Sequence, residues 1–225
     1  PKTVRRQRQM CIRDRDLNCD GHADLVISNT GSIDSPVGYS AIEIFHGSAT
    51  GYNGTPDRTF VSNAQGRLLG YSLLVLPDVT GDGCDDLLAS EPLNGTEAYN
   101  AGRLWLWAGS SSGMASTTAW SLDGTSNARL GLALTAAGDV DGDGQPDLLV
   151  SGAGSGANPG QLDLYFGNGN GFAADTQTIV TGSAGEYAAE RVMAQLDTDG
   201  DGLEEMASSR RVAALDGGTH SLSIE

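Results

Sequence analysis

Four copies of one acidic motif recur along the sequence. Each copy reads D-x-[D/N/T]-x-D-G-x-x-[D/E] before a mostly apolar run, and the copies are DLNCDGHADLVIS (16–28), DVTGDGCDDLLAS (78–90), DVDGDGQPDLLVS (139–151) and DTDGDGLEEMASS (197–209). Successive copies begin 62, 61 and 58 residues apart. A nearly fixed period of this length indicates one repeated supersecondary unit, and it limits the possible folds more than any other feature of the chain.

A second landmark follows the motif in the first three repeats. The segments SAIEIFHGSATGY, GRLWLWAGSSSGM and GQLDLYFGNGNGF each combine an alternating strand pattern with G-x-x-x-G, and the first glycines are Gly47, Gly109 and Gly167. Each unit then holds four strand-like runs: one before the acidic loop, one after it, the alternating run and a last run. Four short antiparallel strands per repeat are typical of a β-propeller blade.

We therefore predict an all-β fold, a β-propeller fragment of about 3.5 four-stranded blades with repeats of roughly 60 residues. The expected repeats are 16–66, 67–128, 129–184 and 185–225, the first without the strand before its loop and the last abbreviated. Residues 1–15 hold six of the thirteen basic residues and resemble no repeat, so we exclude them as a non-native or disordered basic segment.

The acidic loops need a compensating cation. Carboxylates about 4 Å apart repel by about 4 kcal/mol per pair at an effective dielectric constant of about 20. Calcium suits such a cluster because it accepts about six to eight oxygen ligands in a flexible shell. We predict up to four Ca²⁺ ions, one per loop, with the tightest binding in the third and fourth loops, which have four acidic side chains each. Gly144 and its equivalents permit the sharp turn.

The motif spacing assigns each loop four side-chain ligands and one backbone carbonyl, supplied by His22, Cys84, Gln145 and Leu203 in turn. The predicted ligands are Asp16, Asn18, Asp20, His22 and Asp24; Asp78, Thr80, Asp82, Cys84 and Asp86; Asp139, Asp141, Asp143, Gln145 and Asp147; and Asp197, Asp199, Asp201, Leu203 and Glu205. An EF-hand loop has similar spacing but closes with an acidic residue at its last position, where this chain has Ile27, Ala89, Val150 and Ser208.

Charge and cysteine content narrow the possible partners. A formal net charge of −16 disfavours nucleic acid, and no apolar run is long enough to span a membrane. Cys11, Cys19 and Cys84 show no zinc-type pair. Cys19 and Cys84 could pair in an exported protein, but we expect them to be unpaired small residues.

Two local features could indicate further chemistry. GSSSG (109–113) satisfies the nucleophile-elbow pattern, but the equivalent turns read GSATG and GNGNG, so we expect Ser111 to be a turn residue beside two turn glycines. Trp105 stands where the other repeats have Glu43 and Asp163; it could stack on a sugar, although packing is its expected role. The sequence offers no catalytic constellation, and we do not expect an enzyme.

The approach strands LLGYSLLVLPD and ARLGLALTAAGD, the acidic loops and the following SEP or SGAG resemble the FG-GAP repeats of the integrin α-subunit propeller and its bacterial relatives. The likeness covers 16–225. It implies a ring of about seven blades, of which this chain would be a truncated part from a bacterial member. The remaining blades or a second copy would then cover its open edges.

The resemblance implies a calcium-binding module for adhesion or ligand recognition, outside the cell or on its surface, with calcium in a structural role. Whether the ligand is a protein or a carbohydrate is left open. The alternatives are a scaffold or appendage of a secreted polysaccharide-degrading enzyme, and a lectin-like carbohydrate-binding propeller whose sugar binding would depend on Trp105.

Overall fold

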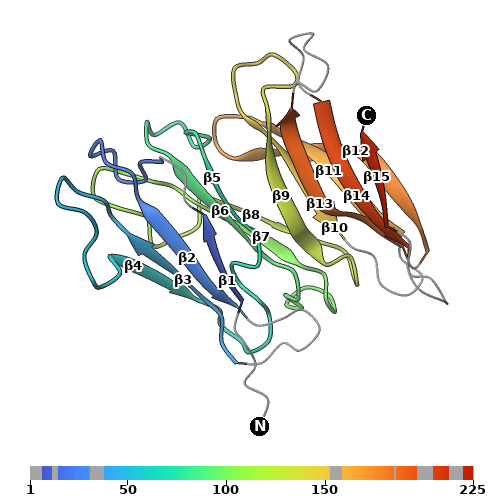
Figure 1. Cartoon of the computed structure of the whole chain (residues 1–225), viewed down its shortest axis with the longest axis horizontal. Coiled ribbons are helices and arrows are strands. Elements are labelled where there is room, and N and C mark those ends of the chain that lie inside the picture. The colour runs from blue at the N-terminus through green and yellow to red at the C-terminus, as the bar shows by residue number, and fades with distance from the viewer. Residues whose placement is uncertain are drawn as a thin grey trace.

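The computed structural model describes residues 7–11, 15–30, 38–152, 159–184, 186–196, 205–212 and 220–224, which form four antiparallel sheets (Figure 1). The strands are β1 (Gln7–Cys11), β2 (Leu25–Thr30), β3 (Ala41–Phe45) and β4 (Arg58–Val61); β5 (Leu73–Leu76), β6 (Asp86–Glu91), β7 (Arg103–Trp107) and β8 (Trp120–Asp123); β9 (Leu130–Gly138), β10 (Asp147–Gly152), β11 (Pro159–Gly167) and β12 (Phe172–Ala184); and β13 (Glu186–Leu196), β14 (Glu205–Val212) and β15 (His220–Ile224). Strands neighbour one another in chain order within each sheet. The predicted all-β architecture of successive four-stranded blades is confirmed.

The first sheet differs from the prediction at its start. Residues Gln7–Cys11, inside the segment we excluded, pair antiparallel with β2 from Thr30 to Val26. The first sheet therefore has a strand before its acidic loop, where none was expected. The physical reason is that β2 would otherwise leave an edge of unpaired backbone groups, which an extended segment of any composition can satisfy. The amino-acid composition of the basic segment does not indicate this pairing.

The sheets pack face to face through apolar side chains. One core cluster joins Val26 and Ile44 of the first sheet to Val75 and Leu87 of the second, and another joins the second sheet to the third. Successive side chains of β7 alternate between these two clusters: Trp107 packs in the first cluster, and Leu104 and Leu106 pack in the second. Strand β6 is buried along its whole length because both faces of its sheet are covered.

The landmark glycines are fixed by a close backbone approach. A Cβ on Gly47 would overlap the carbonyl oxygen of Ala23, one on Gly109 would overlap that of Asp85, and one on Gly167 would lie 2.6 Å from that of Pro146. Each of these carbonyls belongs to the residue just before the last acidic residue of the loop. A side chain in place of a landmark glycine would thus push the third strand of the sheet (β3, β7 or β11) away from the acidic loop of the same sheet.

A disulfide joins the first two acidic loops. Cys19 and Cys84 are bonded, with their Cα atoms 5.5 Å apart, so our expectation of unpaired residues was wrong. The two loops lie side by side: the Asp16 backbone N–H donates to Asp85 Oδ2 at 3.0 Å, and the Asp85 N–H donates to the Asp16 carbonyl at 3.3 Å. Because the two cysteines are 65 residues apart in the sequence, local patterns did not indicate this contact between neighbouring blades.

None of the described residues forms a helix that could cross a membrane.

Candidate metal centre

One hydrogen-bonding frame recurs in the first three acidic loops. The last acidic residue of each of these loops is buried, and its carboxylate accepts backbone N–H bonds from the second residue of the loop and from the landmark glycine; Asp86 accepts a third, from Thr80 at 2.9 Å. The donors are Leu17 and Gly47 to Asp24, both at 2.8 Å; Val79 and Gly109 to Asp86, at 2.8 and 3.0 Å; and Val140 and Gly167 to Asp147, at 2.7 and 2.9 Å. Each loop is thus hydrogen-bonded to the end of the third strand of its own sheet, β3, β7 or β11.

The first acidic residue of each loop closes the turn. In the third loop, Asp139 Oδ1 accepts the Asp143 N–H at 3.0 Å, and Asp139 Oδ2 accepts the Gly144 N–H at 2.9 Å. Asp16 and Asp78 accept the equivalent bonds in their loops. The sixth loop position has a left-handed φ each time, +83° at Gly21, +93° at Gly83 and +89° at Gly144. The turn predicted at Gly144 is therefore confirmed.

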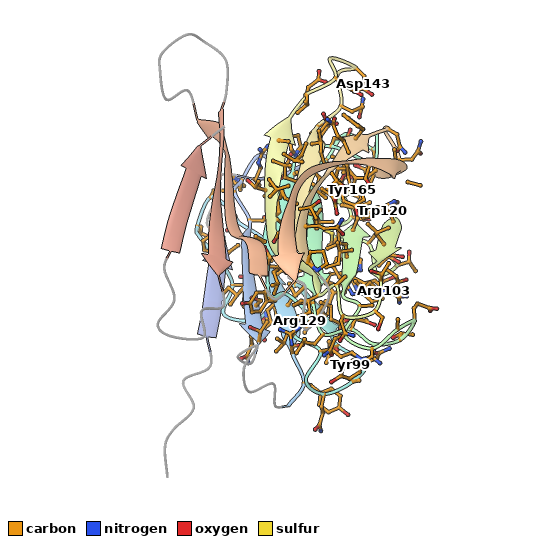
Figure 2. All side chains as sticks on the ribbon, turned by 90° about the vertical axis from the view of Figure 1, so that its right-hand side faces the viewer. Tyr99, Arg103, Trp120, Arg129, Asp143 and Tyr165 are labelled. Carbon is orange, nitrogen blue, oxygen red and sulfur yellow. A yellow bond between two sulfur atoms is a disulfide. The ribbon has the colours of Figure 1, made fainter. Side chains whose placement is uncertain are left out.

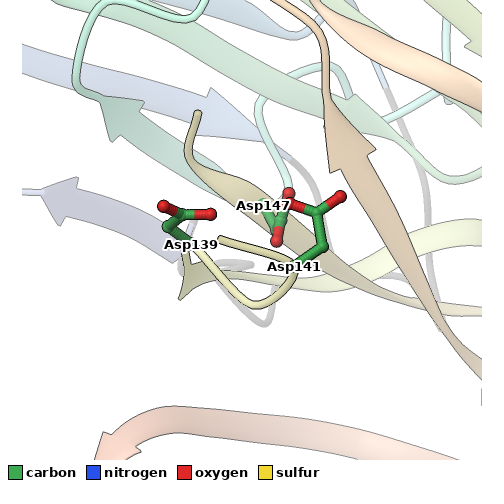
Figure 3. A group of neighbouring side chains, drawn as sticks. All are labelled: Asp139, Asp141 and Asp147. Carbon is green, nitrogen blue, oxygen red and sulfur yellow. The ribbon is translucent and has the colours of Figure 1, made fainter. Parts of the chain in front are cut away.

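The third loop gathers carboxylates around one point. Ligand oxygens of Asp139, Asp141 and Asp147 all lie within 4.8 Å of one another (Figure 3). Asp147 is buried at the start of β10, whereas Asp139 and Asp141 are exposed. Asp143, the fourth predicted carboxylate, lies outside this group and accepts the Gln145 N–H at 2.7 Å. Figure 2 shows Asp143 at the opposite end of the molecule from Tyr99.

The first and second loops have a polar, uncharged residue at the third position. The Asn18 amide donates to Asp20 Oδ2 at 2.9 Å, and the Thr80 hydroxyl donates to Asp86 Oδ1 at 3.2 Å. His22 and Cys84 donate their backbone N–H groups to Asp20 and Asp82. Among the described residues, neither loop brings three carboxylates as close together as the third loop does. In the fourth loop, Asp197, Asp199, Asp201 and Leu203 lie outside the described residues, and of Glu205 only the backbone is described, at the start of β14.

Positive side chains do not offset these carboxylates in the second and third loops. Within the described ranges, no Lys, Arg or His forms an ion pair with any of the predicted carboxylate ligands there. Burial raises the pKa of Asp86 to about 6, although the N–H groups of Gly109, Val79 and Thr80 act in the opposite direction. Burial likewise raises the pKa of Asp24. A bound cation would relieve this cost of burying the charged form.

Sequence reasoning missed one contact of the first loop. The His46 imidazole lies beside Asp24, with 3.5 Å between Nδ1 and Oδ2, and the Asp24 carboxylate is completely buried. The available signal was the position of His46 directly before the landmark Gly47, where the other repeats have Ala108 and Phe166. The chain has three histidines, so this departure from the repeat could have indicated the contact.

Trp105 and the GSSSG segment have packing and turn roles in the described structure. Trp105 is partly buried within the first core cluster, with the Arg103 guanidinium 4.9 Å from its ring centroid and Trp107 at 6.2 Å. Its indole N–H donates to Glu91 at 3.2 Å. In GSSSG, the Ser110 hydroxyl donates to the Gly113 carbonyl at 2.6 Å, closing the turn.

The fold and the repeated acidic loops define a class of protein, and comparison with known families agrees. The model for the FG-GAP-like repeat matches twice, at residues 78–150 and 139–208, which together cover more than half of the chain. The chain therefore belongs to the FG-GAP repeat family.

Three relatives are integrin α subunits. Integrin alpha-4 of Xenopus laevis is 28% identical over 159 residues, covering 66% of this chain and 15% of the relative. Integrin alpha-PS2 of Drosophila melanogaster is 43% identical over 93 residues, covering 38% and 7%. Integrin alpha-PS5 of the same fly is 29% identical over 152 residues, covering 63% and 15%. The chain thus spans at most about a seventh of these relatives. None of the three relatives is named as an enzyme.

Proposed function

We propose that this chain is a calcium-binding propeller module for adhesion or ligand recognition outside the cell, with calcium in a structural role. The observation that carries the proposal is the group of Asp139, Asp141 and Asp147, whose ligand oxygens lie within 4.8 Å of one another. Calcium prefers hard oxygen ligands, and this group offers carboxylate oxygens alone, without thiolate or imidazole.

The residues of each loop have distinct parts in this proposal. In the third loop, Asp139, Asp141 and Asp147 would hold the ion, with Asp143 and the Gln145 carbonyl completing its shell. The first and second loops share the same backbone frame with one charge fewer, because Asn18 and Thr80 replace the carboxylate of Asp141. The ligands of the fourth loop are assigned by the repeat register alone. A bound ion offsets the loop charge and stabilises the folded state by preferential binding.

Two further observations support a role in recognition outside the cell. Disulfides such as Cys19–Cys84 persist in oxidising compartments. The relatives that match this chain are named as integrin α subunits, and a propeller offers loops at both ends of its sheets for contact with a partner. The partner itself remains a proposal, because the chain spans so little of the relatives.

Thermal unfolding with and without calcium tests the proposal. When the free calcium concentration is about 100 times the Kd of a site, binding at that site adds roughly 2.7 kcal/mol to the free energy of unfolding. Chelation should therefore lower Tm, and added calcium should restore it. Asp141→Asn should weaken the third site with little effect on folding, because Asp141 is exposed. A Tm that does not respond to complete removal and return of calcium would refute the proposal.

Paired variants sharpen the assignment of ligands. If the close carboxylate group is the ion site, Asp141→Asn should reduce calcium affinity more than Asp143→Asn, because Asp143 lies outside the group. Glu43→Gln removes the same charge from β3 and serves as the matched control. Calorimetric titration measures all three, and equal losses in the three variants would mean that only general charge attracts the ion.

A further inference from the structure

A polar pocket of about 390 Å³ lies between the first and second sheets, beside the first acidic loop. Asn18, His46, Asp57 and Arg58 line it from the first repeat, and Ser111 and Ser112 line it from the GSSSG turn of the second. The pocket has a guanidinium, an imidazole, an amide and two hydroxyls, all able to donate hydrogen bonds, and one carboxylate, that of Asp57. This donor set is unusual in a chain with a net charge of −16.

Arg58 has no charged partner in the part of the chain that the structure describes. Its Nε atom is buried and has no hydrogen-bond acceptor there, and no described carboxylate forms an ion pair with its guanidinium. The neighbouring Asp57 carboxylate instead accepts the His46 backbone N–H at 2.7 Å. A buried guanidinium nitrogen without an acceptor is costly. An anion bound in the pocket that Arg58 lines would supply the charged partner that the described residues do not.

The repeats show that packing does not require an arginine here. Arg58 pairs with Ile44, and the equivalent residue of the second sheet is Trp120, which pairs with Leu106. Trp120 fills the corresponding place between the second and third sheets, where its ring meets Phe172 edge-on at 5.3 Å. The first repeat thus has a charged residue where the second repeat has the partly buried Trp120 and the third repeat has Gln177, which pairs with Leu164.

A second departure from the repeat meets the first one in the same pocket. His46 stands where the second repeat has Ala108, so both differences introduce donors. The two differences bring a guanidinium and an imidazole to one place, and among the described residues the buried Arg58 Nε and His46 Nδ1 atoms have no hydrogen-bond partner. A ligand that needs several donors explains both.

We propose that this pocket binds the carboxylate of an acidic sugar, with the Arg58 guanidinium as its charged partner. A planar carboxylate matches the paired N–H groups of a guanidinium. Ser111, Ser112 and Asn18 then face the sugar hydroxyls, and the mostly polar lining suits a hydroxylated ring better than the apolar side chains of a peptide. This assignment names a ligand for the proposed recognition function and rests on it.

Calcium in the first loop has a direct effect on this pocket. Asn18 both lines the pocket and is the predicted third ligand of that loop, and His46 lies beside the buried Asp24. The carboxylates of Asp16, Asp20 and Asp24 repel an anion nearby until a divalent cation offsets most of their charge. Acidic-sugar binding is therefore expected to be stronger with calcium than without it.

NMR of the arginine Nε–H groups tests the pocket directly. With calcium present, glucuronate should shift the Arg58 Nε–H signal, which is assigned by its loss in Arg58→Lys, while glucose should not. The Arg67 guanidinium already donates to Asn63 and Thr96 and gives an internal control signal. Arg58→Gln should lower glucuronate affinity by about tenfold or more, and Arg67→Gln should leave it unchanged.

Several outcomes would overturn the assignment. They are equal binding of glucose and glucuronate, no shift of the Arg58 signal, and an affinity that Arg58→Gln does not change. Binding of a blocked aspartate in place of glucuronate would replace the sugar by an acidic side chain. If Arg58→Gln fails to fold, the glucose and glucuronate pair still decides the question on the unaltered protein.

The same experiment separates this inference from the proposed function. Calcium-dependent stabilisation without glucuronate binding would refute the pocket assignment alone. A protein that neither binds calcium nor gains stability from it would refute the proposed function, and the glucuronate titration without calcium would then judge the pocket by itself.

Discussion

Replacing Gly109 by alanine should destabilise the protein strongly, although only one methyl group is added. This methyl would overlap the Asp85 carbonyl oxygen, would lie 2.5 Å from the Leu17 carbonyl oxygen and would lie 3.1 Å from the Cys84 Cβ. These atoms belong to the first two acidic loops, which the disulfide joins. Backbone atoms held in this way cannot turn aside as a flexible side chain could.

The magnitude follows from two effects. Overpacking in a well-packed region costs about 1–3 kcal/mol, and the contacts with two carbonyl oxygens place Gly109→Ala at the upper end. Displacing the strand also strains the 3.0 Å bond from the Gly109 N–H to the buried Asp86 carboxylate, and losing a hydrogen bond to a charged group costs about 1.5–3 kcal/mol. We expect a loss of about 3–5 kcal/mol.

Urea unfolding in calcium-containing buffer, followed by tryptophan fluorescence, measures this loss. Gly54→Ala is the matched control, because a Cβ there meets nothing within 4 Å and the φ of Gly54 is not positive. Its stability should stay the same or rise slightly, since alanine restricts the unfolded chain. If Gly109→Ala loses less than about 1 kcal/mol relative to Gly54→Ala, the close-approach explanation of the landmark glycines is wrong.

Two further predictions concern pH and the disulfide. Burial, with a smaller contribution from Asp163, raises the pKa of Tyr165 to about 12. The folded protein should therefore lose about 1.4 kcal/mol per pH unit between about pH 10, where the unfolded tyrosine ionises, and about pH 12, where the folded one does. Alkaline urea titrations should show that Tyr165→Phe lacks this slope. Replacing Cys19 and Cys84 together by serine should cost about 2–4 kcal/mol in urea unfolding, because the bond closes a loop between residues 65 positions apart; an unchanged midpoint would contradict a stabilising role for the bond.

Repetition made the blades predictable from sequence. The strand after each acidic loop and the alternating strand recur with their turns, so local pattern and global fold agree in β2, β6 and β10 and in their partners. The frame of the loops was also predictable, since the spacing of Asp139, Asp141 and Asp147 fixes which carboxylates can converge. Both signals depend on distances of a few residues along the chain.

Features that depend on contact between blades were not predictable. Both glycines of G-x-x-x-G were expected to be turn residues, but the left-handed φ belongs to the second, +95° at Gly113, whereas Gly109 is required by the carbonyls of Asp85 and Leu17. The disulfide between Cys19 and Cys84 and the pocket lined by both Arg58 and Ser111 likewise involve different repeats. A single sequence gives the order of blades but not which side chains face one another across them.

The buried carboxylate that ends each of the first three acidic loops also bears on how fast and how selectively an ion could be bound. Asp147 is held by the backbone of Val140 and Gly167, and Asp139 by that of Asp143 and Gly144, through bonds that involve no metal. At the proposed ion site these carboxylates are therefore preorganised, and little chain entropy would remain to be lost on binding an ion. A cradle of fixed size accepts an ion by its radius, so calcium and magnesium should differ in affinity far more than they would at a loose acidic segment.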